Sequence, residues 1–151
     1  MKVGVLGAFA LVAATSLNAQ VIADLGAATP SEGNWTYAAT PQGSEANFAN
    51  ASGAAQLWVH CTRATRRVTI SKSATAAAPA LNVWTSSLTK SVPSSFDAAT
   101  SRLTVDLSNY DPLLDAIATS RGRIGFSVGS EPPLVLPAWA EAAHVIEDCR
   151  A

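Results

Sequence analysis

Apolar and polar residues alternate along the chain in short runs, which is the pattern of half-buried β-strands. In the clearest run, Leu57, Val59 and Cys61 are expected to share one face of a strand. Trp58 and His60 then fall on the opposite face. Runs of this kind predict strands over residues 35–40, 45–50, 56–61, 68–71, 81–85, 103–107, 123–128 and 134–136.

One segment in the second half of the chain has the signals of a helix instead. Asp111 is a good N-cap, and Pro112 suits the first helical position because it has no N–H group to leave unsatisfied. Gly122 is a natural stop for a helix. The first helix is therefore predicted over about 111–121.

A second helix is predicted near the end of the chain, beginning at Pro137 and running over about 137–149. Val145 and Cys149 fall near one face of this helix, four residues apart. Cys149 is therefore expected to point toward the sheet, close to the strand that carries Cys61.

The predicted strands recur at intervals of roughly ten to twenty residues and are separated by turns. Pro93–Ser95 and Asp97 are among the residues predicted to form turns. The pattern predicts a mainly β fold, a small antiparallel β-sandwich or barrel-like domain with two short α-helices. A chain of 151 residues is normally one domain, expected here over 35–151, after a flexible mature N-terminus at 20–34.

The beginning of the chain has the parts of a secretory signal peptide. Lys2 supplies a basic start, residues 3–14 form an uncharged run too short to span a bilayer, and Ala19 is small enough for the cleavage site. A signal peptide is therefore predicted over 1–19, and the protein is expected to be periplasmic or extracellular, without stable membrane insertion after cleavage. The alternative is a membrane anchor or a buried N-terminal helix.

The overall charge argues against a nucleic-acid partner. Lysine and arginine together number 10 and aspartate and glutamate 11, so the formal net charge is −1. This balance gives no basic surface of the kind that binds a phosphate backbone. Charged residues make up only 14% of the chain, which suits an exported β-rich domain.

The predicted export favours a disulfide between the two cysteines. In an oxidising compartment, two cysteines in a small domain are most simply one disulfide, so a bond between Cys61 and Cys149 is predicted. In the chain-entropy model, closing a loop of this length stabilises a fold by at most about 4–5 kcal/mol. The alternative is two separate buried thiols.

No catalytic residue is predicted. Gly125–Gly129 matches the G-x-S-x-G pattern of a nucleophile elbow, with Ser127 at its centre, but the elbow needs a turn into a helix and this motif lies along a predicted strand. A small hydrolase that uses Ser127 and His144 remains the alternative. His60 and His144 are the only histidines and lack metal-ligand spacing, so neither a metal nor another cofactor is predicted.

Arg121 and Arg123 are candidate ligand contacts at the predicted end of the first helix. Guanidinium groups presented there can bind a carboxylate or a phosphate. The alternative is that they only complement the helix dipole. The four tryptophans could line a glycan or peptide groove, although in a small β domain large aromatic residues are more often part of the core.

Six segments carry a resemblance to known proteins: Leu57–Cys61, Val83–Ser87, Leu114–Ala116, Ser120–Arg123, Leu136–Trp139 and Val145–Arg150. In residue pattern and order they resemble small exported proteins of alphaproteobacteria. More distantly, the layout is similar to the invasion-associated locus B proteins and to small β-sandwich proteins linked with type VI secretion. The resemblance covers about residue 35 to the end and implies a β-sandwich in the periplasm or outside the cell, with no catalytic residues carried over.

These observations predict a non-enzymatic exported binding or accessory protein of the cell envelope, monomeric or weakly associating, whose partner is another envelope protein. Export, a compact scaffold and the lack of a credible catalytic pattern in the sequence favour this function. The alternatives are the hydrolase that uses Ser127 and His144, and a glycan- or peptide-binding module that uses exposed tryptophans.

Overall fold

The computed structural model describes residues 24–138 and 140–151. The predicted signal peptide at 1–19 lies outside the described residues. The strands are β1 (Gly33–Thr40), β2 (Gly43–Asn50), β3 (Ala55–Thr62), β4 (Arg67–Ser73), β5 (Ala80–Trp84), β6 (Thr89–Pro93), β7 (Ser95–Asp97), β8 (Arg102–Ser108), β9 (Arg123–Val128) and β10 (Leu134–Pro137), and the helices are α1 (Pro112–Ala118) and α2 (Ala140–Asp148).

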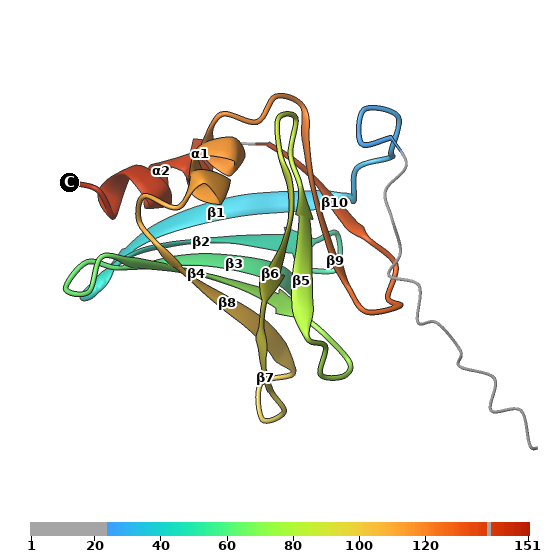
Figure 1. The fold of residues 1–151 in the computed structure, drawn as a ribbon, viewed down its shortest axis with the longest axis horizontal. Helices are drawn as coiled ribbons and strands as arrows, with labels where there is room; N and C mark the ends of the chain where they lie inside the picture. The colour runs from blue at the N-terminus through green and yellow to red at the C-terminus, as the bar shows by residue number, and fades with distance from the viewer. Residues whose placement is uncertain (1–23, 139) are drawn as a thin grey trace, which may run out of the picture.

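Two antiparallel sheets form a sandwich-like fold (Figure 1). Sheet A has six strands in the order β1-β2-β3-β4-β8-β7, and sheet B has four in the order β10-β9-β5-β6. The prediction of a mainly β domain with two helices is confirmed, in its sandwich form. No helix in the described part of the chain is long and apolar enough to cross a membrane.

The core lies between the facing surfaces of the two sheets, as the alternation of residues predicts. Along β3, Leu57, Val59 and Cys61 are buried, whereas Trp58 and His60 on the opposite face are partly exposed. Sheet B contributes a matching row of buried residues, which are Leu81, Val83, Ile124, Phe126 and Val128.

Helix α1 begins where the sequence predicts. The Asp111 side chain accepts a hydrogen bond from the Leu113 N–H group at 2.8 Å, and Pro112 is the first helical residue. The helix ends at Ala118, earlier than predicted. Thr119 caps it, because both its N–H group and its hydroxyl bond to the carbonyl oxygen of Asp115, at 2.9 and 2.7 Å.

The predicted start of the second helix at Pro137 is wrong. Pro137 is the last residue of β10, where it pairs with Arg123 of β9, and α2 begins only at Ala140. The carbonyl oxygen of Pro137 accepts a hydrogen bond from the Trp35 indole at 3.2 Å, which ties β10 to β1. A proline suits the end of an edge strand as well as the first turn of a helix, so the residue alone did not distinguish them.

The turn prediction between residues 93 and 97 is also wrong in part, because β6 ends at Pro93 and Ser95–Asp97 forms β7. Both are edge strands that pair on one side only. Val92 is the one buried residue of the two strands. Their sequences therefore lack the alternation of apolar and polar residues that identifies a strand.

The predicted disulfide is present. Cys61 of β3 and Cys149, the residue that follows α2, are bonded with their Cα atoms 5.5 Å apart, and both side chains are fully buried. Gly43 of β2 packs directly against this strand. A Cβ atom there would lie 2.2 Å from the Cys61 carbonyl oxygen, so only glycine fits at this point of β2.

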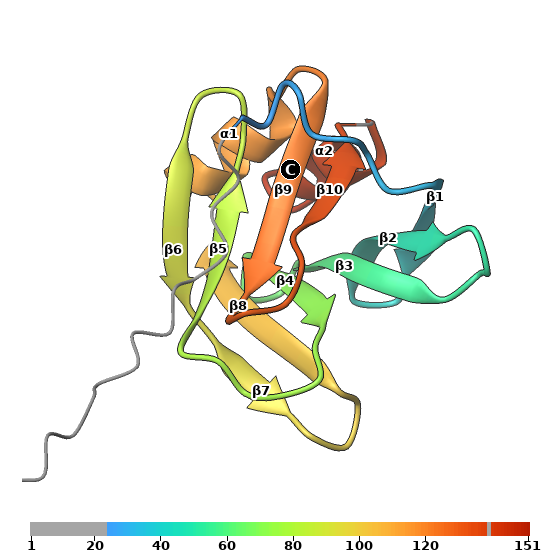
Figure 2. The ribbon, with the colours of Figure 1, turned by 90° about the vertical axis from the view of Figure 1, so that its right-hand side faces the viewer.

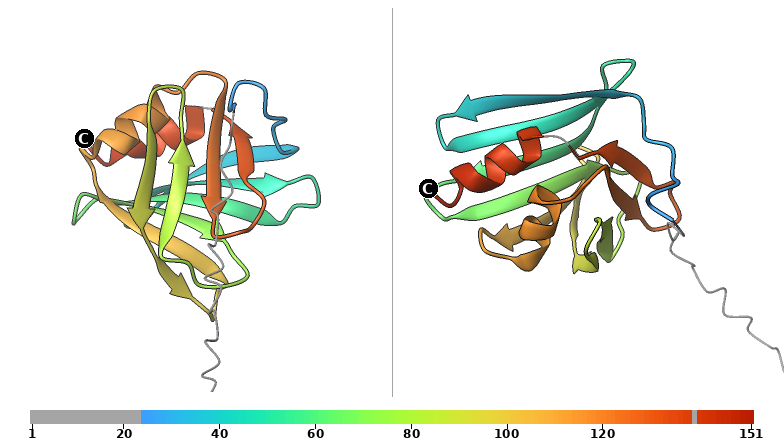
Figure 3. Two further views of the ribbon diagram at one scale, coloured as in Figure 1. Left: turned by 45° about the vertical axis from the view of Figure 1, so that its right-hand side comes forward. Right: turned by 90° about the horizontal axis from the view of Figure 1, so that it is seen from above.

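Helix α2 covers the inner face of sheet A along β1, β2 and β3 (Figure 3). Arg150 fastens its end to the neighbouring helix, because its guanidinium donates hydrogen bonds to the Asp115 carboxylate at 2.7 Å and to the Asn109 carbonyl oxygen at 2.9 Å. The Asn109 side chain donates in turn to the Cys149 carbonyl oxygen at 3.0 Å. The end of α2 is thus held by a covalent bond and by a small polar network.

Replacing both cysteines, in a Cys61→Ser/Cys149→Ser variant, is expected to lower the free energy of unfolding by about 2–5 kcal/mol. The reason is that a cross-link between two positions with a sequence separation of 88 no longer restricts the unfolded chain. Urea unfolding followed by circular dichroism, with and without reductant, measures this change. Reductant should destabilise the unmodified protein by a similar amount and leave the variant unaffected. Equal stability of the two proteins under oxidising conditions would contradict this prediction.

Candidate functional site

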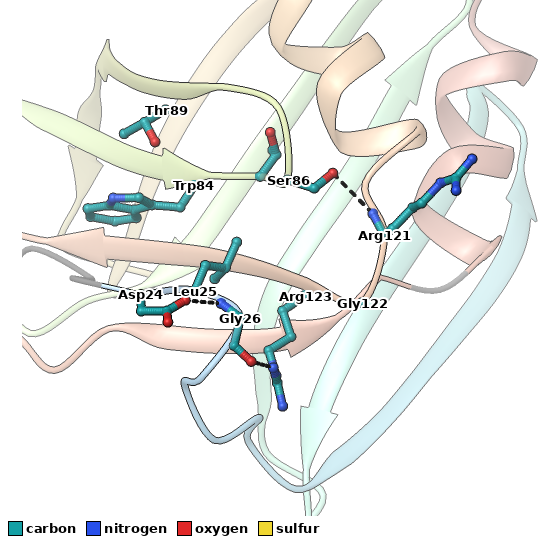
Figure 4. A pocket seen from close by; sticks show the side chains of 10 residues that line it. Asp24, Leu25, Gly26, Trp84, Ser86, Thr89, Arg121, Gly122 and Arg123 are labelled. Carbon is teal, nitrogen blue, oxygen red and sulfur yellow. Dashed lines mark hydrogen bonds between the residues drawn. The ribbon is translucent and has the colours of Figure 1, made fainter.

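The two predicted ligand contacts, Arg121 and Arg123, line a cavity of about 430 Å³ at one end of sheet B (Figure 4). We call this cavity the arginine cleft. Three segments form it: the turn at residues 24–26, the connection between β5 and β6, and the connection between α1 and β9. Its lining residues are Asp24, Leu25, Gly26, Trp84, Thr85, Ser86, Thr89, Arg121, Gly122 and Arg123.

Two serines lock the connections on either side of the cleft together. The Ser120 hydroxyl accepts a hydrogen bond from the Ser86 N–H group and donates one to the Arg123 carbonyl oxygen, both at 3.1 Å. The Ser86 hydroxyl accepts one from the Arg121 N–H group at 3.2 Å. Between the arginines, Gly122 has a φ of +87°, a conformation that glycine adopts without strain. The backbone that carries both arginines is therefore well fixed.

The guanidinium groups of the two arginines point in different directions (Figure 4). Arg123 donates a hydrogen bond to the Gly26 carbonyl oxygen and so holds the turn that forms one wall of the cleft. The Asp24 carboxylate in that turn accepts hydrogen bonds from the N–H groups of Gly26 and Ala27. Arg121 is exposed, and its guanidinium has no hydrogen-bond or ion-pair partner among the described residues. The two arginines that the sequence suggested as ligand contacts therefore differ in their surroundings, because Arg123 is bonded to the turn and Arg121 is not.

Trp84 supplies the apolar wall of the cleft. It lies opposite Gly125 in the ladder between β5 and β9, so no side chain from that position crowds its indole. Trp84 is only 8% exposed, yet it is not part of the main core cluster. In Figure 2, the segment that precedes β1 passes across the ends of β9 and β10 on this side of sheet B.

The other described tryptophans differ in their surroundings. Trp35 belongs to the core, where it packs edge-on against Phe48, as predicted for most of them. Trp58 lies on the outer face of sheet A, with the Arg102 guanidinium 3.6 Å from its ring centroid. Trp139 is outside the described residues. No row of exposed tryptophans that would form a glycan-binding platform occurs among Trp35, Trp58 and Trp84.

Ser127 and His144, the residues of the alternative hydrolase, lie on different layers. Ser127 is fully buried in β9 of sheet B, where it pairs with Asn82. The His144 ring stacks on Tyr37 of sheet A, with centroids 4.2 Å apart, and its Nε2 atom lies 3.7 Å from the Asp148 carboxylate. His144 is therefore oriented by Tyr37 and Asp148, and the geometry does not make it a base for Ser127.

The cluster around His144 was not predicted from the sequence. The Tyr37 hydroxyl donates a hydrogen bond to the Asp148 carboxylate at 2.7 Å. Burial alone would raise the pKa of Asp148, but the hydrogen bond from the Tyr37 hydroxyl and the nearby His144 and Arg63 side chains lower it below its usual value. The hydrogen bond to Asp148 raises the pKa of Tyr37 in turn. This cluster anchors α2 on sheet A.

A buried ion pair at the opposite end of the sandwich was also missed. Lys72 of β4 is 5% exposed, and its ammonium group lies 3.2 Å from the Glu131 carboxylate and 2.9 Å from the Ser73 carbonyl oxygen. The other Glu131 oxygen accepts two hydrogen bonds of 2.7 Å from Thr75, one from its N–H group and one from its hydroxyl. This pair ties the connection between β9 and β10 to sheet A.

A sequence signal for this pair did exist. Lys72 continues the row of inward-facing residues that begins with Val68 and Ile70, so strict alternation along β4 places its side chain inside the sandwich. A lysine in such a position needs an anionic partner, because an unpaired buried charge is costly. The sequence could not show that this partner is Glu131.

The described residues contain no group of three or more histidine, cysteine, aspartate or glutamate side chains that could hold a metal ion. Comparisons of the chain with protein-family models, with curated proteins and with solved structures find no match. The candidate site therefore rests on the geometry of the chain itself.

Replacing Glu131 by glutamine is expected to lower the free energy of unfolding at pH 7 by about 1–3 kcal/mol, because Lys72 loses its anionic partner. Burial alone would raise the pKa of Glu131, but the hydrogen bonds from Thr75 and the nearby Lys72 charge lower it below its usual value of 4.5. The carboxylate therefore stabilises the fold fully above about pH 4.5, and this contribution is lost as the pH falls through the lower pKa of the folded state.

Urea unfolding of the unmodified protein and the Glu131→Gln variant between pH 7 and pH 3 measures this dependence. The difference in stability between the two proteins should shrink toward the acid end. Glu32→Gln is the matched control, since Glu32 is exposed, and its effect should be small at every pH. A difference for Glu131→Gln that does not change with pH would show that the ion pair is not its source.

Proposed function

We propose that the protein is an exported, non-enzymatic binding module of the cell envelope. In this proposal, it holds an anionic segment of another envelope protein in the arginine cleft. The observation that carries the proposal is that Arg121 lines a cavity whose walls are fixed by hydrogen bonds, while its guanidinium has no partner among the described residues.

The chemistry of the cleft suits a carboxylate or phosphate group on an extended ligand. The guanidinium N–H groups of Arg121 have no acceptor among the described residues, and a guanidinium can bind a carboxylate or phosphate through two parallel hydrogen bonds. Ser86, Thr89 and the Trp84 ring also line the cleft, so it offers both polar groups and an apolar wall, although the Arg121 side chain points away from the Trp84 ring in Figure 4. A small number of polar groups around an apolar wall is typical of binding sites.

The cleft is also largely preformed, which favours binding. The Ser86 and Ser120 hydrogen bonds and the contact from Arg123 to Gly26 hold its three segments before any ligand arrives. Binding to a rigid site costs less conformational entropy than binding to loops that must first become ordered. Arg123 is thus expected to act through the shape of the cleft, and Arg121 through direct contact.

Export remains a prediction from the sequence at residues 1–19. The disulfide between Cys61 and Cys149 is compatible with a protein outside the cytoplasm, because such bonds persist in oxidising compartments. The hydrolase is the less favoured alternative, since Ser127 is buried in sheet B while His144 is held by residues of sheet A. A glycan platform is less favoured as well, because the exposed aromatic row that it needs is not found among the described tryptophans.

The Arg121→Ala variant is expected to bind an acidic peptide about tenfold more weakly than the unmodified protein, because a charge-assisted hydrogen bond to the ligand is lost. The probe is a short peptide of alternating glutamate and serine, compared with its glutamine counterpart. Binding is measured by calorimetry and by tryptophan fluorescence, in which a Trp84→Phe variant identifies the responding residue. Affinity should fall as salt increases.

Arg66→Ala is the matched control, because Arg66 is an exposed arginine on the turn between β3 and β4 that does not line the cleft. It should leave peptide affinity unchanged. Envelope extracts passed over the unmodified protein should yield a partner that Arg121→Ala does not retain. Equal binding of the acidic and glutamine peptides, or equal binding by Arg121→Ala, would count against the cleft as the site.

A further inference from the structure

The described strands form two sheets with four edges, and three of these edges carry a feature that prevents pairing with another chain. Strand β6 has Lys90 and ends at Pro93, which has no N–H group to donate. Strand β7 is only three residues long and ends on the charged Asp97. Strand β10 is four residues long and its edge is in use, because the Val135 carbonyl oxygen accepts a hydrogen bond from the Ser31 N–H group at 2.7 Å.

The fourth edge, β1, has none of these features. It is eight residues long, from Gly33 to Thr40, and contains neither a charged residue nor a proline. Its register with β2 is regular from end to end, without the bulge that interrupts β2 and β3. On its outer face, Asn34, Thr36 and Ala38 are exposed. Strand β1 lies at the outer margin of sheet A in both views of Figure 3.

An edge of this kind presents unpaired backbone donors and acceptors to a further strand. In an antiparallel pair, alternate residues direct their N–H and C=O groups toward the neighbour, so the remaining residues of β1 direct theirs away from β2. No described residue pairs with β1 on that side. Eight residues correspond to about 27 Å of strand, which is long enough for several hydrogen bonds between chains.

We propose that the free edge of β1 is a self-association surface, on which β1 of a second copy of this chain pairs in antiparallel orientation. Sheet A of each copy then continues into the other across a twofold axis. An antiparallel pair of identical strands satisfies this symmetry automatically, because each residue meets the same set of partners in both copies. No ligand in the arginine cleft is required.

A second copy fits this edge better than an acidic partner segment does. The strand is uncharged, so two copies meet without repulsion between like charges and nothing in β1 selects a charged ligand. The exposed side chains of Thr36 and Ala38 are uncharged, so they can lie beside the same residues of a second copy without repulsion. Because only one strand from each copy takes part, the buried area is small, and association is expected to be weak and dependent on concentration.

Sedimentation equilibrium of the purified protein from about 10 µM to 1 mM tests this proposal, since weak interfaces dissociate in this range. The average mass is expected to rise from that of one chain toward that of two. A Thr36→Lys/Ala38→Lys variant, in which lysines from the two copies face each other across the edge, should remain a single chain at all concentrations. Both positions are exposed, and circular dichroism with urea unfolding checks that the variant folds normally.

The matched control is Ser91→Lys, which places a lysine at an exposed position on the edge strand β6. This variant should associate like the unmodified protein. Hydrogen exchange should show that amides of β1 become slower to exchange as concentration rises. A protein that stays a single chain up to 1 mM, or a dimer that survives in the β1 variant and is lost in Ser91→Lys, would overturn the proposal. Protection of β1 only after addition of an envelope extract would assign the edge to a different protein and overturn it as well.

Discussion

The disulfide between Cys61 of β3 and Cys149 at the end of α2 holds this helix against sheet A. Sheet A has six strands and sheet B only four, and helix α2 packs on β1, β2 and β3 of the larger sheet. The side chains of Val145 and Ile146 in this helix are fully buried. A helix of nine residues is too short to be stable by itself, and its position depends on tertiary contacts. The disulfide holds it where those contacts can form.

The sequence predicted the parts of this fold that depend on local patterns. Alternation located most strands, and the cap at Asp111 located the start of α1, because each signal is set by neighbouring residues. The errors arose where a local signal fits two structures. Pro137 is compatible with the end of a strand and with the start of a helix, and the polar residues of β6 and β7 resemble a turn. Pairing with a neighbouring strand decides such cases.

The candidate site was partly accessible from the sequence for the same reason. Arg121 and Arg123 stand out because they flank a glycine where a helix should stop. Their partners come from distant segments, since Gly26 precedes Arg123 by 97 residues, and no pattern in the sequence joins them. The hydrogen bond from Tyr37 to Asp148 spans 111 residues and was missed on that account. Lys72 was the exception, because the alternation along β4 alone places its side chain inside the sandwich, where it needs an anionic partner.

The sequence separation of 88 between the two cysteines also bears on how the chain matures. During synthesis from the N-terminus, Cys61 appears long before Cys149, so sheet A can assemble while its thiol is still unpaired. The chain contains two cysteines, so it has no incorrect intramolecular disulfide to form. The errors that remain are links between different chains or oxidation of a lone thiol. The yield of correctly oxidised protein therefore depends on whether α2 docks and brings Cys149 to Cys61 before two incompletely folded chains meet and form a disulfide between them.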